Sequence, residues 1–165
     1  MGEMTVLELS DVAYLLQLTN STVKNWTIGR PLSIKPSIRA SRGKGSRNLY
    51  SIEDVNLLAL AVQLTRDGFA LKTVQRVLKE LKGRSDLLGS DYSTLVISSP
   101  KAGPEIKLPE IKFLSGPVTI GVHEQLRADV IGRYVLNLTK MVEWVENRIE
   151  GMRRAVGKNP LESKH

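Results

Sequence analysis

Residues 18–51 read LTNSTVKNWTIGRPLSIKPSIRASRGKGSRNLYS, a stretch that holds seven basic residues and no acidic residue. The acid-free gap is wider still, because the forty-one positions between Asp11 and Glu53 lack Asp and Glu in a chain that is 25% charged. Basic side chains mixed with hydroxyls, amides and two aromatic rings suit a phosphate backbone with some base-edge contact. A solvated basic loop is the plainer interpretation of the same charge pattern.

The composition narrows the class of protein further. The 165 residues carry 24 basic and 17 acidic side chains, and the net charge of +7 favours a polyanionic partner. The chain has no cysteine, which excludes disulfides, thiolate metal sites and thiol redox sensing, and neither His123 nor His165 has a metal-ligand partner nearby. No apolar run approaches the length of a membrane span or of a signal-peptide core, so we expect a cytoplasmic protein without membrane contact.

Two short helices separated by a polar turn are predicted at the start of the chain. Residues 9–18 carry an apolar stripe behind Ser10 as the expected N-cap. Thr19 and its polar neighbours then begin a second helix, anchored in the core by Val23 and above all Trp26. This is the sequence pattern of a helix-turn-helix, although many helical hairpins share it. The exposed positions of the second helix, all able to hydrogen-bond to bases or phosphates, would be Ser21, Thr22, Lys24 and Asn25.

A β-hairpin wing is predicted over residues 34–50. Gly29-Arg30-Pro31 ends the second helix, because proline cannot continue the helical hydrogen bonds. At the tip, residues 41–46, two glycines between basic residues favour a turn that projects cations. A phosphate-cradling nucleotide loop is excluded, since GKGS lacks the required spacing and buried strand. With the second helix, the wing completes a predicted DNA face: Ser21, Thr22, Lys24, Asn25, Arg39, Arg42, Lys44, Arg47 and Tyr50.

Two further helices complete the predicted first domain, residues 1–84. Ser51 and Asp54 have the spacing of a capping box, and the helix that follows should end before Gly68. Its apolar residues cover more than one face, which indicates a central core helix. From Ala70 an apolar stripe indicates a fourth helix that ends before Gly83.

The run RGKGSRNLYSIEDVNLLALAVQLTRDGFALKTVQRVLKEL, residues 42–81, resembles the DNA-binding domain of the MerR family of transcriptional regulators. That family combines a basic wing, an arginine followed shortly by Tyr-Ser, an acidic helix start and a glycine step into the fourth helix. Here these features are Arg47, Tyr50-Ser51, Glu53-Asp54, and Asp67-Gly68-Phe69-Ala70-Leu71 with Val74. Residues 18–24 are similar to the family's V-S/T-x-x-T-L-R pattern, with Trp26 where an aromatic is frequent. Thr27 departs from the usual glutamate, and residues 28–31 are rearranged.

The resemblance implies a dimeric, sequence-specific regulator that binds double-stranded DNA at a palindromic promoter site. Each protomer would place its second helix in a major groove and its wing along the backbone. Family members typically act at promoters with an overlong spacer and activate by distorting the DNA so that polymerase can engage.

The same resemblance indicates which kinds of effector this chain could sense. Metal-responsive relatives use cysteines and drug-responsive relatives an aromatic-lined pocket, whereas this chain has no cysteine and 5% aromatic residues. We therefore expect no cofactor, no metal and no thiol-redox inducer. Either no effector acts, or RNA polymerase or another protein partner docks on residues 86–121.

Residues 85–121 are predicted to form a β-rich connector. Residues 93–98 have β-like composition, and EIKLPEIKF, residues 105–113, alternates apolar and charged residues. Three prolines punctuate the region, so its strands should be short and at an edge. A small β-meander and a loosely ordered linker both fit this pattern.

A long helix is predicted over residues 122–157, ahead of a flexible tail at 158–165. Its apolar residues recur at alternating spacings of 4 and 3, the heptad pattern of a coiled coil. The β-branched positions lean towards a parallel pair, whereas the resemblance implies an antiparallel pair that spreads the DNA-binding domains apart. A helix packed on its own domain is the alternative. The predicted dimerisation seam is Ile131, Val135, Leu138, Val142, Val145, Ile149, Met152 and Val156.

The predicted fold class is mostly α with a small β wing: a winged helix-turn-helix domain, a short β-rich connector and a long C-terminal coiled-coil helix. We expect no enzyme, because the sequence has no nucleophile-base pair, His-carboxylate cluster or metal constellation. A non-enzymatic architectural or excisionase-like DNA-binding protein, whose terminal helix recruits a partner protein, is the second hypothesis. A preference for one palindrome would favour the regulator, and cooperative coating of many sequences would favour the architectural protein.

Overall fold

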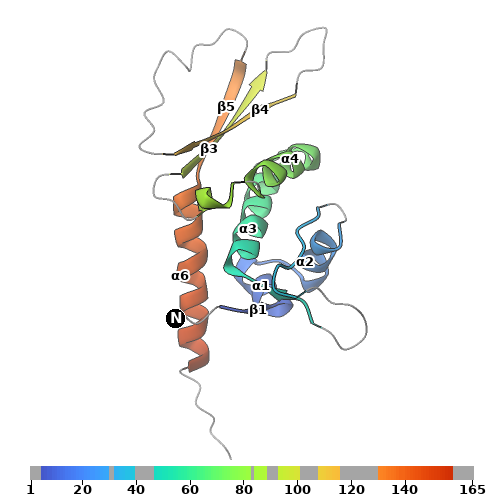
Figure 1. The fold of residues 1–165 in the computed structure, drawn as a ribbon, viewed down its shortest axis with the longest axis vertical. Helices are drawn as coiled ribbons and strands as arrows, with labels where there is room; N and C mark the ends of the chain where they lie inside the picture. Colours follow the sequence, from blue (N-terminus) through green and yellow to red (C-terminus); the bar gives the residue numbers. More distant parts are fainter. Residues whose placement is uncertain are drawn as a thin grey trace, which may run out of the picture. The chain divides into compact units, whose positions relative to one another are not determined.

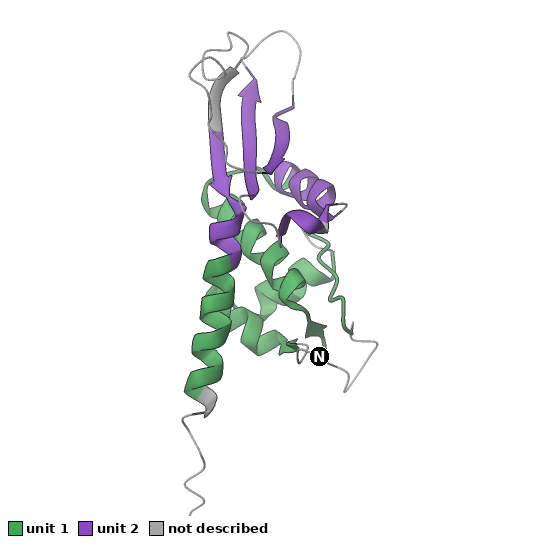
Figure 2. Ribbon diagram, turned by 60° about the vertical axis from the view of Figure 1, so that its left-hand side comes forward, with its two compact units in different colours: residues 1–71, 143–165 green, residues 72–142 purple. Residues whose placement is uncertain are grey.

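The structure is a computed structural model that describes residues 5–29, 32–39, 47–82, 84–88, 93–100, 108–115 and 130–157. The chain divides into two compact units, residues 1–71 with 143–165, and residues 72–142 (Figure 2). The predicted tail at 158–165 lies outside the described residues.

The first unit contains β1 (Leu7–Glu8), α1 (Leu9–Leu16), α2 (Asn20–Thr27), β2 (Leu49–Tyr50) and α3 (Ile52–Arg66) (Figure 1). The second contains nearly all of α4 (Leu71–Lys82), the 3-10 helix η1 (Ser85–Leu88), and the strands β3 (Ser93–Pro100), β4 (Glu110–Ser115) and β5 (Val130–Asn137). The last helix, α6 (Leu138–Gly157), begins in the second unit and continues into the first.

α1 and α2 form the predicted helix-turn-helix, joined by a tight turn. α1 begins after Glu8, whose backbone N–H donates to Asp11 Oδ2 at 2.8 Å, so the expectation of an N-cap at Ser10 is wrong by two residues. In the turn, Gln17 takes the left-handed conformation with φ 54°, which costs a residue with a side chain roughly 1–2 kcal/mol. Thr19 then caps α2, its Oγ1 accepting from Thr22 N–H at 3.1 Å.

α3 is the central helix of the first unit, as its apolar pattern predicted. The capping box is confirmed, because Ser51 Oγ accepts from Asp54 N–H at 3.2 Å and Ser51 N–H donates to Asp54 Oδ2 at 2.9 Å. The helix ends at Arg66, and Gly68 follows with φ 86°, a conformation that glycine adopts without strain. The apolar faces of α1, α2 and α3 share one core, whose most buried side chains include Leu15, Val23, Leu58, Leu60 and Leu64.

The stem of the predicted wing is a small antiparallel arrangement centred on β2. Leu7 and Glu8 of β1 pair with Tyr50 and Leu49 respectively. On its other side, Leu49 exchanges both backbone hydrogen bonds with Arg39, at 3.2 and 2.8 Å. The hairpin is therefore confirmed at its stem, whereas its predicted tip, residues 41–46, lies outside the part of the chain that the structure describes.

The second unit is built on a three-stranded antiparallel sheet with the strand order β4-β3-β5. The central strand β3 places Leu95 opposite Phe113 of β4 and Leu136 of β5, and Leu95 and Phe113 are buried. Arg76 of α4 donates from Nη1 to the Pro109 carbonyl just before β4, at 3.1 Å. The connector thus supplies one antiparallel pair, β3 and β4, and not a meander, because β5 joins the sheet beside β3 rather than beside β4. The expectation that the connector's strands lie at an edge holds for β4 and is wrong for the central strand β3.

The predicted helix over residues 122–157 is wrong in its first part. Residues 130–137 form strand β5, which pairs with β3, and the helix begins only at Leu138; residues 122–129 lie outside the described ranges. Ile131 and Val135 of the predicted seam are therefore strand residues. A spacing of four keeps two side chains on one face of a strand as well as on one face of a heptad helix, so the seam pattern could not tell the two apart. The β-branched residues around Tyr134 favour the strand.

The remaining seam residues show how α6 uses its apolar face. Four of them are at most 9% exposed within the single chain: Leu138, Val142, Val145 and Ile149. Ser93 N–H of β3 donates to Thr139 Oγ1 at 2.9 Å, and Arg153 Nη2 donates to Thr5 Oγ1 in the first unit. The alternative of a helix packed on its own chain therefore holds at these four positions, and the structure shows a helix over Leu138–Gly157 without showing the predicted coiled coil.

Candidate nucleic-acid interface

α2 presents a polar face to solvent and an apolar face to the core. The exposed side chains are Asn20, Ser21, Lys24 and Asn25, while Thr22 is half-buried. Trp26, at 9% exposed, packs inward as expected. The four α2 residues predicted from sequence thus lie on or beside one side of the helix, and no acid accompanies them.

Two features of the α2 face were missed by sequence reasoning. Thr19 Oγ1 lies 2.8 Å from Ser21 Oγ and 2.9 Å from Thr22 Oγ1, so three hydroxyls gather at the first turn, where backbone N–H groups also point outward. At the other end, Ile28 is 64% exposed. The i, i+4 spacing of Lys24 and Ile28 was the available signal, because the second helix was predicted to end only at Gly29-Arg30-Pro31.

The wing stem contributes two arginines whose situations differ. Arg39 is exposed beside its bridge to Leu49. Arg47 is also exposed, but its Nη1 donates to both carboxylate oxygens of Glu8, at 2.8 and 3.0 Å. The charge of Arg47 is therefore partly compensated by β1. The predicted tip cations Arg42 and Lys44 lie outside the described residues.

Tyr50 does not belong to the surface, contrary to its place in the predicted DNA face. It is 0% exposed, because on the two-residue strand β2 its ring turns into the core. Burial raises the pKa of its phenol, although hydrogen bonds with Thr27 and Asn48 oppose the shift. Asn48 Nδ2 donates to the phenol oxygen at 3.4 Å. Tyr50 thereby connects the last turn of α2 to the wing stem.

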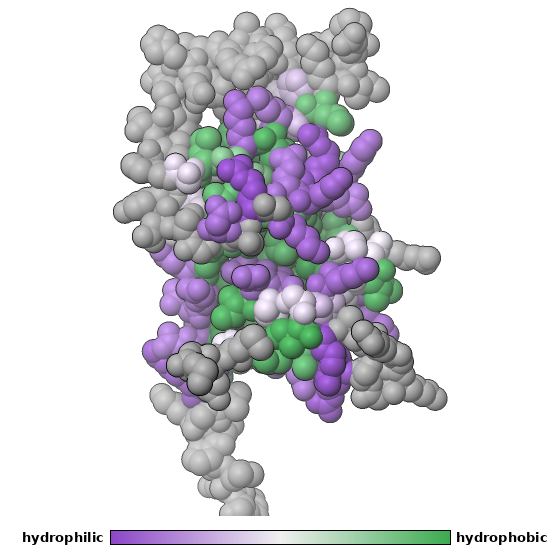
Figure 3. Space-filling model, in the orientation of Figure 1, coloured by the Kyte–Doolittle hydropathy of each residue, from purple (hydrophilic) through white to green (hydrophobic). Residues whose placement is uncertain are grey.

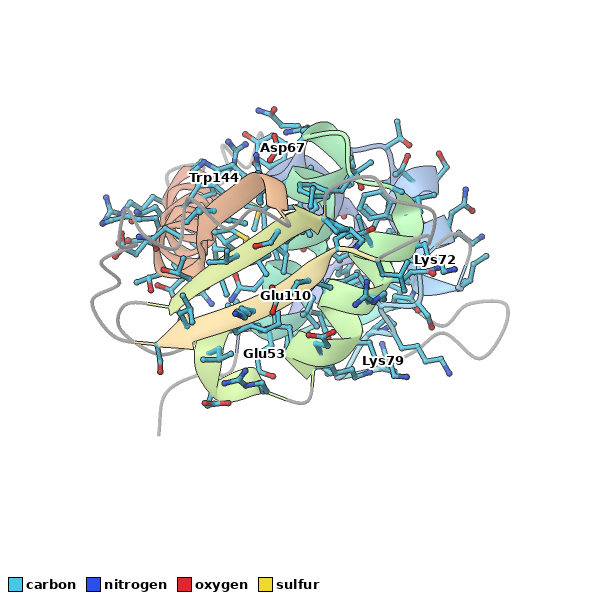
Figure 4. The ribbon with its side chains drawn as sticks, turned by 90° about the horizontal axis from the view of Figure 1, so that it is seen from above. Glu53, Asp67, Lys72, Lys79, Glu110 and Trp144 are labelled. Carbon is cyan, nitrogen blue, oxygen red and sulfur yellow. The ribbon has the colours of Figure 1, made fainter. Side chains whose placement is uncertain are left out.

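The rest of the described surface is mixed in character. On the side shown in Figure 3, hydrophilic and apolar residues are interspersed. In the second unit α4 exposes Lys72 and Lys79, which Figure 4 labels along one helix. These lysines belong to a different unit from α2 and the wing stem, so they are not grouped with that face.

α6 exposes a second kind of face. Trp144, which Figure 4 labels, is 45% exposed. The Arg148 guanidinium lies 4.9 Å from its ring centroid. Gly151 and Ala155 are also exposed and fall on the same side, at i+7 and i+11 from the tryptophan. A Cβ added to Gly151 would meet nothing within 4 Å. This side of α6 therefore carries a large ring at one end and small residues at the other.

The described residues contain no helix that is both long and apolar enough to cross a membrane.

The comparisons with known proteins concern the part of the chain that contains the α2 face. A search of curated proteins found no match. In a comparison with family models, residues 7–81 match the model described as MerR HTH family regulatory protein, which spans the elements from β1 to α4. Residues 7–81 therefore form a domain of the MerR helix-turn-helix type, the type found in a family of DNA-binding transcription regulators.

Proposed function

We propose that this chain is a dimeric, sequence-specific regulator that binds a palindromic promoter site in double-stranded DNA. The observation that carries the proposal is the outward face of α2, which has hydrogen-bonding side chains, one lysine and no acid. A helix of this kind, second in a helix-turn-helix, fits the major groove with its exposed residues against base edges.

The α2 face supports both positioning and base reading. The hydroxyls of Thr19, Ser21 and Thr22 suit phosphate oxygens near the positive end of the helix. Lys24 suits the O6 and N7 acceptors of guanine, and Asn25 suits the N6 and N7 groups of adenine. Ile28 suits a thymine methyl group, which makes it a specificity residue in this proposal.

The wing supplies the sequence-independent part of the binding. Four cations would contact phosphates: Arg39, Arg42, Lys44 and Arg47. Each contact would make the slope of log affinity against log salt more negative by about 0.9. Tyr50 is not among the proposed DNA contacts, because its ring is buried and its role is structural.

A homodimer would use the exposed side of α6 rather than the seam proposed from sequence. Four seam positions are already covered within one chain, so freeing them would cost the burial that holds α6 in place. The side with Trp144, Arg148, Gly151 and Ala155 is self-complementary in an antiparallel pair. With the twofold axis midway between residues 149 and 150, Trp144 faces Ala155 of the second copy and Arg148 faces Gly151. Glycine in mid-helix costs about 1 kcal/mol relative to alanine, a cost that close helix approach would explain.

Two further steps belong to the proposal. A twofold dimer would set the spacing of the two half-sites and could hold a distorted DNA, at a deformation cost of about 1–6 kcal/mol. RNA polymerase or another protein partner would dock on the connector, where Glu110 and Lys112 of β4 are exposed and 3.3 Å apart.

Selection of bound sequences from random double-stranded DNA tests the proposal. We expect one palindromic motif with two half-sites and an affinity that falls steeply with salt. Cooperative coating of unrelated sequences would instead favour the architectural, excisionase-like protein, and the absence of any salt-dependent binding would exclude both.

A further inference from the structure

The base of the wing is held by one buried carboxylate. Asp54, on the first turn of α3, is 5% exposed, and its Oδ2 accepts three hydrogen bonds. The donors are Ser37 N–H at 2.8 Å, Ser37 Oγ at 2.7 Å and Ser51 N–H at 2.9 Å. Two of the three come from a residue 17 positions earlier in the chain.

These bonds divide into a local set and a distant set. Ser51 belongs to the capping box, which any helix start can form from neighbouring residues. Ser37 has no part in capping α3, because the box is complete without it. Its two bonds to Asp54 fasten a separate segment, and Ser37 Oγ also lies 2.9 Å from Ser51 Oγ.

The segments that meet at Asp54 are the two arms of the wing. One arm leaves Ser37 and reaches Arg39 two residues later, where it pairs with Leu49. The other arm returns through Leu49 and Tyr50 to Ser51. Both arms therefore begin at a residue that donates a hydrogen bond to the same oxygen, Asp54 Oδ2. In the sequence, the wing cations from Arg39 to Arg47 lie between these two anchors, Ser37 and Ser51.

From this arrangement we infer that Asp54 is a positioning residue for DNA binding, which holds the wing arm at Ser37 so that its cations meet the backbone in a fixed direction. The inference rests on the proposed DNA-binding function. A wing freed at one anchor must be ordered when DNA binds, and that ordering lowers affinity although no DNA contact is removed.

Ser37→Ala is the central variant, because it removes the hydroxyl donor and leaves the capping box intact. Ser51→Ala is the matched control, since it weakens the cap of α3 and removes the Oγ contact between Ser37 and Ser51, but leaves both Ser37 bonds to Asp54 in place. The measurements use the full chain: affinity for the selected DNA at several salt concentrations, and amide hydrogen exchange of Arg39 and Leu49 in the free protein.

For Ser37→Ala we expect DNA affinity to fall about tenfold at an unchanged salt slope, because no phosphate contact is lost, and exchange at Arg39 and Leu49 to accelerate about tenfold. For Ser51→Ala we expect a lower melting temperature with nearly unchanged DNA affinity. Unchanged exchange and unchanged affinity in Ser37→Ala would overturn the inference. Accelerated exchange in a protein whose wild type shows no salt-dependent DNA binding would instead overturn the proposed function, and with it the role of Asp54 in DNA binding.

Discussion

α2 and α6 both turn one side to the core of the first unit and one side to solvent, but what they expose differs. α2 exposes hydroxyls, amides and a lysine. α6 exposes a tryptophan with an arginine stacked on it, followed by glycine and alanine. Polar donors suit phosphates and base edges, whereas an aromatic ring beside small residues suits another protein surface.

The difference teaches that the exposed side of a helix, rather than its apolar stripe, indicates its partner. The apolar stripe of α6 has the heptad spacing of a coiled coil, yet four of its residues are already buried by packing within the chain. Only side chains left at the surface after folding can meet a partner. The predictions that follow test this contrast between the two helices, in order of decreasing expected effect.

The largest effect should come from a charge placed in the buried stripe of α6. Val145 is 1% exposed, so Val145→Asp should lower the free energy of unfolding by about 3–5 kcal/mol and the melting temperature by roughly 10 °C. Thermal melting followed by circular dichroism measures this. A variant that melts like the wild type but has become monomeric would restore the stripe as a dimer seam.

The next effect concerns the neighbouring position on the opposite side of α6. Trp144→Asp should leave the helix content unchanged and weaken the dimer by about 2–4 kcal/mol, because an aromatic anchor of the proposed interface is replaced by a charge. Sedimentation over a range of concentrations follows the monomer fraction. An unaltered dimer in this variant would exclude the Trp144 side as the interface.

Gly151 offers a control for the same surface. Gly151→Ala should stabilise the isolated helix by about 1 kcal/mol, since nothing lies within 4 Å of the added Cβ in the single chain. If two α6 helices approach at this point, the larger Gly151→Leu should dissociate the dimer without unfolding the monomer.

A smaller effect is expected on the DNA side. Lys24→Ala should relax base preference at one position of each half-site by about 1–3 kcal/mol. Lys79→Ala, an equal charge change on α4, is the matched control and should leave base preference unchanged. Repeating the DNA selection with both variants decides the matter. Equal loss of affinity for all sequences in Lys24→Ala would make Lys24 a phosphate contact only.

The sequence was sufficient for the fold where several independent signals agree. At α3 the capping box of Ser51, the glycine after Arg66 and the apolar faces all indicate the same helix. At β5 a single periodicity was available, and the spacing of Ile131 and Val135 fits strand and helix alike. The β-branched residues around Tyr134 favour a strand, but it is the pairing with β3, a long-range property, that establishes it.

The candidate site shows the same division. The exposed residues of α2 could be predicted because helical spacing fixes which side chains share a face. The inward turn of Tyr50 could not, since β2 has two residues and its alternation has no local signal. The contact between Ser37 and Asp54 spans 17 positions and depends on the path of the wing.

Tyr50→Phe should have an effect of about 1 kcal/mol on stability, from the lost hydrogen bonds of the phenol. Because burial raises the pKa of this phenol in the folded state, the folded protein favours the neutral form. Its contribution is therefore present below the unfolded pKa of about 10 and is lost as the pH rises above that value. Melting temperatures between pH 8 and 11 should fall more steeply for the wild type than for Tyr50→Phe. Parallel curves would mean that the phenol is not shielded from water.

The smallest effect concerns Arg47, which contacts Glu8 in the free chain and would contact a phosphate in the proposed complex. Glu8 holds its guanidinium through two hydrogen bonds, but both side chains are substantially exposed, so the pair contributes only about 0–1 kcal/mol to stability. Glu8→Gln should leave folding nearly unchanged and release Arg47 towards phosphate. We expect DNA affinity to rise a few-fold and the salt slope to steepen by about 0.9.

Glu53→Gln is the control, because it makes the same change in net charge at an exposed carboxylate on α3 (Figure 4). If both variants raise affinity equally, net charge alone is responsible and Arg47 remains a structural partner of β1. A rise confined to Glu8→Gln would instead identify Glu8 as a competitor of DNA for one wing arginine.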